Sequence, residues 1–304
     1  MTMTDVKLSV RDVVKRYQSH TAVDHISLDV QRQSIFGLLG PNGAGKTSLI
    51  RMITQITMPD EGAIRFDGQA LHESHTRRIG YMPEERGLYK QMKVGDHVMY
   101  LAQLRGLSLW DAQKKVQMWF ERLHIMDWWN KKVEELSKGM QQKVQFIATV
   151  VHEPELLILD EPFSGLDPIN ADLIKDEIHR LKDEGATIIF STHRMEQVEE
   201  ICDRIALVHL GRNILSGEVK AIKQQFKKHH YRIQFDGILP QSGDTAYSIV
   251  SQKTGEAVIA TQPGVSPNQL LTHLLSRVEM YAFQEVLPSL NEIFIEHVKG
   301  YNHA

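Results

Sequence analysis

The segment formed by residues 40–47 restricts the possible folds of this chain more sharply than any other part of its sequence. It reads Gly-Pro-Asn-Gly-Ala-Gly-Lys-Thr and fits the pattern Gly-x-x-x-x-Gly-Lys-Ser/Thr. Residues 35–39, directly before it, form an apolar run typical of a buried strand, and residues 48–56 have a helical pattern. A glycine-rich loop between a strand and a helix directs backbone N–H groups toward phosphate oxygens. The sequence therefore predicts a loop that binds the phosphates of a nucleotide.

The residue types in this loop predict how the nucleotide is held. The Lys46 ammonium group is expected to reach the β and γ phosphates, and the Thr47 hydroxyl is expected to bind Mg²⁺. We therefore expect ATP as the substrate and Mg²⁺ as its metal. The residues predicted to contact ATP in this region are Gly40, Pro41, Asn42, Gly43, Ala44, Gly45, Lys46, Thr47 and Ser48.

Two acidic residues, Asp160 and Glu161, follow the apolar run of residues 156–159. Ligands of parallel sheets bind at the carboxyl ends of the strands, which is where this pair is expected to lie. Asp160 is suited to hold the Mg²⁺ that bridges the phosphates, and Glu161 is suited to orient or deprotonate the attacking water. Together with the phosphate loop, the pair predicts hydrolysis of ATP rather than binding alone.

Apolar runs and helical patterns alternate along the first two thirds of the chain. Strands are predicted at residues 8–14, 26–30, 35–39, 63–66, 79–82, 156–159, 187–190 and 205–210. Helices are predicted within residues 94–151 and at residues 170–184 and 195–202. Continuous apolar strands that are separated by amphipathic helices indicate a parallel sheet covered on both faces. The fold class is therefore α/β.

The pattern changes near Gly217. Beyond it we expect helices at residues 220–228, 268–275 and 290–298, strands at 231–235, 247–250 and 257–260, and a hairpin turn at 253–256. These elements predict a small α+β domain, and none of its residues forms a motif that can be tied to chemistry.

Charge and composition argue against several other classes of protein. A net charge of -3 gives no reason to expect a nucleic-acid partner. The single cysteine, Cys202, excludes an internal disulfide and lies in an apolar pattern that predicts a buried position. The apolar runs are much shorter than the ~20 residues that cross a bilayer, so no segment is expected to span a membrane.

Residues 136–143, Leu-Ser-Lys-Gly-Met-Gln-Gln-Lys, precede the strand that ends in Asp160 and Glu161. This stretch resembles the signature sequence of ATP-binding-cassette (ABC) ATPases. Three further features of that family occur in the order the family has them. Tyr17 occupies the position of the aromatic that stacks on adenine, residues 164–167 resemble the D-loop, and His193 matches the switch histidine.

The resemblance covers roughly residues 5–217 and implies a P-loop NTPase cassette. Such a cassette has a RecA-like parallel sheet core with an antiparallel β subdomain and a helical subdomain, here expected at about residues 88–150. Residues 218–304 would then form the C-terminal accessory α+β domain.

The family also implies roles for individual residues. His193 would contact the γ-phosphate, and Asp167 of the D-loop would belong to the ATP site. Ser137 and Gly139 would bind the ATP of a second subunit, with two cassettes arranged head to tail. In this family, Gln usually follows the strand that is expected here at residues 79–82. This chain has Glu84 at that position, and its carboxylate is expected to bind Mg²⁺ or water. Met140 also departs from the signature, which puts any polar contact of its side chain in doubt.

Residues 83–89, 136–143 and 288–294 resemble those of bacterial ATPase subunits of type-2 ABC exporters, of the sodium-export and drug-export kind. This narrower resemblance implies a homodimer that powers a separate multi-span membrane permease. The chain would then lie in the cytoplasm, bound to the inner face of the membrane through that permease. Two alternatives stay open: a non-transport ABC ATPase and a nucleotide-dependent regulator.

Overall fold

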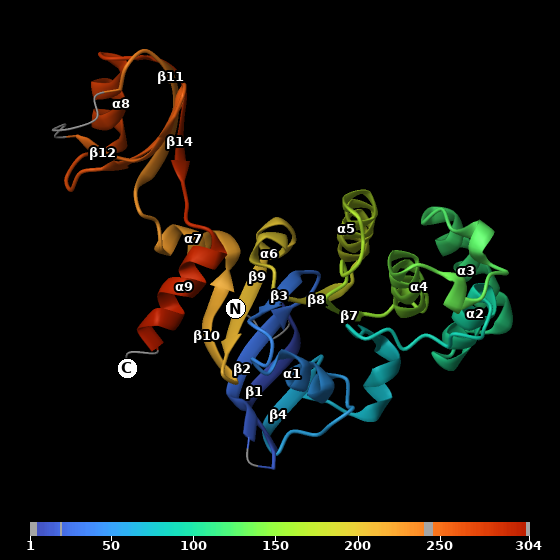
Figure 1. Cartoon of the computed structure of the whole chain (residues 1–304). Coiled ribbons are helices and arrows are strands. Elements are labelled where there is room, and N and C mark those ends of the chain that lie inside the picture. The colour runs from blue at the N-terminus through green and yellow to red at the C-terminus, as the bar shows by residue number, and fades with distance from the viewer. Residues whose placement is uncertain (1–4, 19, 240–245, 302–304) are drawn as a thin grey trace. The chain divides into compact units, whose positions relative to one another are not determined.

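The computed structural model describes residues 5–18, 20–239 and 246–301, and the chain divides into two compact units. The first unit ends at Val219, and the second begins at Lys220 (Figure 1). The phosphate loop and all the other predicted site residues lie in the first unit, and residues 288–294 lie in the second.

The first unit contains a six-stranded sheet in the order β10-β9-β3-β8-β7-β6. Five strands run parallel, and β10 is antiparallel to β9. Every residue of β3, β7 and β8 is buried, as expected for strands covered on both faces, which confirms the predicted parallel core. The bounds are β3 Ile35–Leu39, β6 Ile79–Met82, β7 Leu156–Asp160, β8 Thr187–Thr192, β9 Arg204–His209 and β10 Arg212–Glu218.

A second, antiparallel sheet has the order β2-β1-β4-β5. Its strands are β1 Val6–Tyr17, β2 His20–Gln31, β4 Glu61–Phe66 and β5 Gln69–Ala70. The predictions of 8–14 and 26–30 were too short for β1 and β2. The register between them shifts at several points, and Asp12 and His25 have positive φ angles of 51° and 53°. Such bulges interrupt the alternation of apolar and polar residues that reveals a strand in sequence.

Helix α1, Lys46–Ile53, packs in one hydrophobic core with the antiparallel sheet and one face of the parallel sheet. It begins two residues earlier than predicted, because Gly45 at φ 108° turns the chain directly into the helix. It ends three residues earlier than predicted, because Gln55 takes the left-handed conformation at φ 61°.

The helical part of the first unit surrounds buried aromatic rings. The Trp119 ring lies 5.9 Å from that of Phe146 in an edge-on arrangement, and both side chains are buried. The helices here are α2 Val94–Leu104, α3 Leu109–Arg122, η3 Met126–Trp128, η4 Val133–Glu135 and α4 Lys138–Val150. The short helix η2 Glu73–Arg78 comes earlier, between β5 and β6. Helices α5 Pro168–Asp183 and α6 Met195–Ile201 connect the later strands of the parallel sheet.

The second unit has its own four-stranded antiparallel sheet, in the order β12-β13-β11-β14, and its own apolar core with α8. The observed turn between β12 and β13 confirms the predicted hairpin. Strand β14 was not predicted, and the last helix is longer than expected. The bounds are α7 Val219–Gln225, β11 His230–Asp236, β12 Tyr247–Lys253, β13 Glu256–Thr261, α8 Pro267–Leu275, β14 Glu279–Val286 and α9 Leu290–Tyr301.

Candidate functional site

At two positions in the loop of residues 40–47, the backbone takes a conformation that only glycine adopts without strain, and other backbone atoms lie close to the Cα. Gly40 and Gly45 have φ angles of 147° and 108°. A Cβ atom on Gly40 would lie 2.1 Å from the Val208 carbonyl oxygen, and one on Gly45 would lie 2.2 Å from that of Ala22. Both glycines are therefore required for the loop to pass between neighbouring backbones.

Lys46 is almost fully buried at the first turn of α1, and it belongs to both the loop and the helix. Its Nζ donates hydrogen bonds to the carbonyl oxygens of Gly40 at 2.7 Å and Pro41 at 3.1 Å. Burial lowers the pKa of Lys46, whereas nearby carboxylates act in the opposite direction. The ammonium group is thus held under the loop, within reach of any anion that the loop binds.

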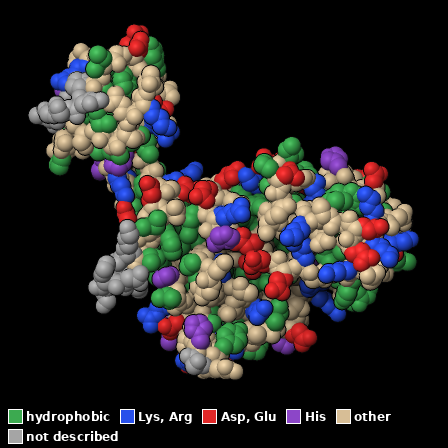
Figure 2. Space-filling model, in the orientation of Figure 1, with side chains coloured by type: hydrophobic (Ala, Val, Ile, Leu, Met, Phe, Trp, Pro, Cys, Tyr) green, Lys and Arg blue, Asp and Glu red, His purple; other side chains and the backbone are tan. Residues whose placement is uncertain are grey.

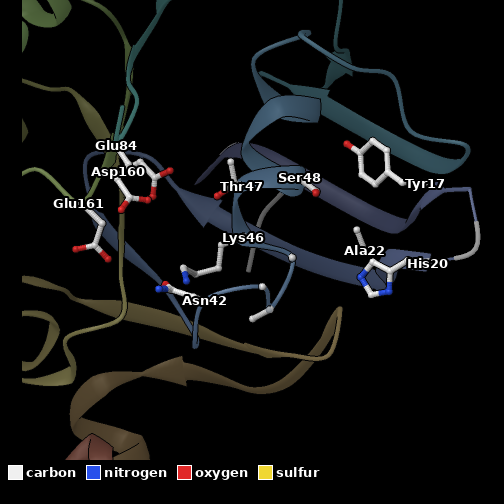
Figure 3. A pocket seen from close by; sticks show the side chains of 13 residues that line it. Tyr17, His20, Ala22, Asn42, Lys46, Thr47, Ser48, Glu84, Asp160 and Glu161 are labelled. Carbon is white, nitrogen blue, oxygen red and sulfur yellow. The ribbon is translucent and has the colours of Figure 1, made fainter. Parts of the chain in front are cut away.

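A cavity of about 390 Å³ opens beside the loop. Figure 3 shows Glu84, Asp160 and Glu161 at one end, Tyr17 and His20 at the other, and Lys46, Thr47 and Ser48 between them. The residues that line it are Tyr17, His20, Ala22, Asn42, Gly43, Ala44, Gly45, Lys46, Thr47, Ser48, Glu84, Asp160 and Glu161. One elongated cavity therefore brings an exposed aromatic ring, a glycine-rich loop, one ammonium group and three carboxylates together.

The carboxylates come from the ends of two neighbouring parallel strands. Asp160 is the last residue of β7, and Glu84 follows β6 by two residues. Asp160 is 3% exposed, and burial raises its pKa. The negative charges of Glu161 and Glu84 act in the same direction, and the positive charge of Lys46 acts against them. This end of the cavity therefore carries more negative than positive charge.

Glu161 is held in one orientation by the end of β8. Its Oε1 accepts hydrogen bonds from the His193 backbone N–H at 2.9 Å and from the His193 Nδ1 at 2.6 Å, and its Oε2 accepts one from the Thr192 hydroxyl at 3.1 Å. An ionised carboxylate only accepts hydrogen bonds, so the Nδ1 of His193 carries the proton. His193 does not line the cavity, and it reaches the site through Glu161.

Five other residues predicted to bind ATP do not line this cavity: Gly40, Pro41, Ser137, Gly139 and Asp167. Ser137 caps α4, where its Oγ accepts the Met140 N–H at 3.2 Å. Gly139 lies against the 164–167 segment, since a Cβ there would come within 2.8 Å of the Gly165 carbonyl oxygen. Asp167 is exposed and caps α5 by accepting the Asn170 N–H at 3.0 Å.

The sequence did not single out His20 and Ala22, although both line the cavity. They reach it because β1 and β2 form a hairpin that places the start of β2 beside Tyr17, through the pair of Tyr17 and His20. Only their place just after Tyr17 could have indicated this.

Arg86 and Gln142 form a second group without a predicted role. The Arg86 Nε donates to the Gln142 Oε1, and its guanidinium also donates to the Ser164 carbonyl oxygen, both at 3.2 Å. The Gln142 amide donates to the carbonyl oxygens of Pro162 at 2.9 Å and Glu161 at 3.3 Å. The segments that hold Glu84 and Glu161 are thereby tied to helix α4, which begins at the signature sequence.

This arrangement agrees with what the comparisons with known proteins show. A model of the ABC transporter family matches residues 23–164. The ABC transporter ATP-binding protein YhaQ of Bacillus subtilis is 43% identical over 301 residues, which cover 96% of this chain and 98% of YhaQ. The chain belongs to the family of ABC transporter ATP-binding proteins. It is therefore a transport-associated ATPase that binds and hydrolyses ATP, as the sequence predicted.

Further matches support the same assignment. A model described as "ATP-binding protein DrrA1-3-like, C-terminal domain" matches residues 217–298. The Nod factor export ATP-binding protein I of Ralstonia nicotianae is 35% identical over 214 residues, which are 69% of this chain and 67% of that protein. A solved structure described as the ATP-binding subunit of an ABC transporter is 30% identical, with a TM-score of 0.68, and covers 72% of this chain and 93% of its own. The P-loop NTPase fold is thereby confirmed for the first unit.

The contacts of Arg86 give a prediction for this ATP-binding subunit. Replacing Arg86 with Ala removes the bonds to Gln142 and Ser164, so the segment that follows Glu84 loses its direct link to the segment that follows Glu161. We expect kcat for ATP hydrolysis to fall by about tenfold while KM for ATP changes by less than about twofold. Steady-state phosphate release measures both quantities, with Arg65→Ala on strand β4 as the control. A rise in KM with unchanged kcat would show that Arg86 serves nucleotide binding instead.

Proposed function

We propose that this chain is the ATPase subunit of a membrane exporter and works as a head-to-tail homodimer on the cytoplasmic face of the membrane. The observation that carries the proposal is the single cavity in which the phosphate loop meets Asp160 and Glu161. Export is supported by the likeness to a protein described as a Nod factor export ATP-binding protein. No helix in the described part of the chain is long and apolar enough to cross a bilayer, so a separate permease would supply the membrane path.

The proposed orientation of ATP follows the two ends of the cavity. The adenine stacks on Tyr17, a residue that is 39% exposed, while the backbone of residues 40–45 surrounds the phosphates. Lys46 exchanges its bonds to the loop carbonyls for bonds to the β and γ phosphates. Ser48 lines the middle of the cavity and contributes a further hydroxyl.

The carboxylate end of the cavity fits Mg²⁺. Among the residues that the structure describes, no three His, Cys, Asp or Glu side chains are grouped so that they hold a metal ion without help. Mg²⁺ in nucleotide sites uses one or two protein ligands, and phosphate oxygens and waters supply the rest. We propose Thr47, Asp160 and Glu84 as the protein side of this site. Bound there, Mg²⁺ would neutralise charge on the β and γ phosphates.

Glu161 and His193 are proposed as the catalytic pair. Glu161 accepts a proton from the attacking water or orients that water toward the γ-phosphate. His193 Nδ1–H is bonded to Glu161, so Nε2 can donate to a γ-phosphate oxygen only in the form of the ring that carries a proton on both nitrogens. Thr192 and the His193 N–H hold the carboxylate in place, which limits the reorganisation needed at the moment of reaction.

The dimer would complete each ATP site. Ser137 is exposed and lies outside its own cavity, and its Oγ accepts the Met140 N–H, so its O–H remains for donation to a phosphate. Ser137 and Gly139 are therefore proposed to bind the ATP held by a second copy, with Asp167 at the same interface. Residues 5–217 would form the nucleotide-binding domain, with a helical subdomain at about 88–150, and residues 218–304 an accessory domain.

Charge distribution gives no support to a nucleic-acid partner. On the face drawn in Figure 2, Lys and Arg side chains of the first unit are interspersed with Asp and Glu. Nucleic-acid binding usually requires a gathered basic surface. The transport role is therefore preferred to a role in DNA repair or translation.

Purification from native membranes tests the proposed function. A tagged chain, extracted in mild detergent, is expected to bring with it a membrane protein with several apolar segments of ~20 residues. Mass spectrometry identifies the partner, and an untagged strain is the control. Recovery of the chain with ribosomes or with DNA-repair proteins, and without a membrane protein, would favour the non-transport alternative.

A further inference from the structure

The end of the ATP cavity that contains Tyr17 also contains a second aromatic side chain, that of His20 (Figure 3). Tyr17 ends β1, His20 begins β2, and the two residues pair directly across the hairpin. Side chains of directly paired residues in antiparallel strands lie on the same face of the sheet, with their Cβ atoms about 5 Å apart. The two rings are therefore neighbours, at the opposite end of the cavity from the three carboxylates.

A cation that other groups hold in place covers one face of the Tyr17 ring. The Lys15 Nζ lies over the ring, 5.7 Å from its centroid. The same Nζ donates hydrogen bonds to the Asp60 Oδ1 at 2.8 Å and to the Met58 carbonyl oxygen at 2.9 Å. The Lys15 side chain is only 15% exposed, and these bonds fix its ammonium group over the ring. A base that stacks on Tyr17 therefore uses the opposite face of the ring.

The His20 ring is available to a ligand. His20 is exposed, and none of the described residues forms a hydrogen bond or an ion pair with its ring. An imidazole ring has a flat π face, and nucleic-acid bases stack on His as they do on Tyr. Asp160 and Glu161 lie at the other end of the cavity, so the base is the part of the nucleotide within reach of His20.

Strand β2 leads from His20 directly to the phosphate loop. Ala22 lies on the same face of β2 as His20, because side chains alternate along a strand, and it also lines the cavity. Its carbonyl oxygen lies against the loop, at the point where a Cβ on Gly45 would come within 2.2 Å. Two residues of a strand span about 7 Å, which leaves room for a ribose between a base at His20 and phosphates in the loop.

We infer that His20 is a base-binding residue and that the base of the nucleotide lies between its ring and that of Tyr17. This inference rests on the proposed function, which places the adenine at Tyr17. Contact through two ring faces recognises the flat shape of a base and not its pattern of hydrogen-bond donors and acceptors. His20 therefore contributes equally to the binding of ATP and GTP. It contributes nothing to the binding of inorganic tripolyphosphate, which has no base.

The test measures binding to the full chain by isothermal titration in EDTA, so that the nucleotides stay intact. We expect His20→Ala to weaken the binding of ATP and of GTP by about tenfold, because the stacking of one base on an aromatic side chain contributes roughly that much. His20→Phe keeps a ring and should bind ATP within about twofold of the wild type. Tripolyphosphate should bind the wild type and His20→Ala equally. His179→Ala is the matched control, because His179 is half-buried on α5 and does not line the cavity.

Ring-current shifts in NMR spectra locate the base directly. In a chain with isotope-labelled histidine, ATP should move the ring-proton signals of His20 upfield, whereas tripolyphosphate should leave them in place. The spectrum of His20→Phe lacks these signals and so assigns them. Because this measurement uses the unmodified chain, it decides the question even if His20→Ala folds poorly.

Two results would overturn the inference: an unchanged ATP affinity of His20→Ala, or equal losses of affinity for ATP and for tripolyphosphate. Tyr17→Ala separates this failure from a failure of the proposed function. If Tyr17→Ala weakens ATP binding and His20→Ala does not, Tyr17 binds the base without His20. If neither variant weakens ATP binding, the base lies elsewhere and the proposed orientation of ATP fails as well.

Discussion

Replacing Glu161 with Gln is expected to lower the rate of ATP hydrolysis by at least about a hundredfold while ATP binding is retained. Gln has nearly the same shape and keeps an acceptor oxygen for the His193 N–H, but it cannot take a proton from water. Its amide also removes the charge that His193 Nδ1–H now contacts at 2.6 Å. Single-turnover release of phosphate measures the chemical step, and equilibrium titration with ATP measures binding.

The same variant also tests the proposed dimer. With hydrolysis blocked, ATP should hold two copies together, so light scattering should show twice the monomer mass only when ATP is present. Glu153→Gln is a suitable control, because Glu153 is exposed and pairs with Lys115 away from the site. If Glu161→Gln hydrolyses ATP at a rate near that of the wild type, Glu161 is not the catalytic base and a regulator role regains support.

The parts of the fold that the sequence predicts well are those whose pattern is local. Strands β3, β7 and β8 are buried at every position, and so they appear as continuous apolar runs. Strands β10 and β14 lie at the edges of their sheets and are largely exposed or half-buried. An edge strand with no consistently buried face lacks the alternation that sequence reasoning depends on, which is why both were missed.

The functional site also has a part that local sequence patterns predict and a part that they do not. The phosphate loop, Asp160 and Glu161 are each recognisable because their chemistry lies within a few adjacent residues. The contact between Arg86 and Gln142 joins positions 56 apart in sequence and depends on how the segment after β6 packs against α4. Such contacts follow from tertiary packing, and no local pattern of residue types contains them.

Replacing Lys46 with Met should weaken ATP binding by at least about tenfold, and the loss should exceed that of any other single change in the loop side chains. Lys46 is the only Lys or Arg among the residues that line the cavity, and three carboxylates share that cavity. Without the ammonium group, the phosphates would face Glu84, Asp160 and Glu161 with no opposing protein charge. Isothermal titration with ATP measures the change, with Lys114→Met on α3 as the control.

The stability of the same variant separates a lost binding contact from a damaged fold. Lys46 is desolvated, and its two hydrogen bonds go to loop carbonyls, so an apolar side chain of similar length should leave the melting temperature without nucleotide nearly unchanged. At an ATP concentration of about a hundred times Kd, the wild type should gain about 2.7 kcal/mol of stability from ligand binding. Lys46→Met should lose most of that gain at the same concentration. If it keeps the full ATP-dependent rise in melting temperature, the loop does not bind phosphate through Lys46, and the orientation proposed for ATP must be abandoned.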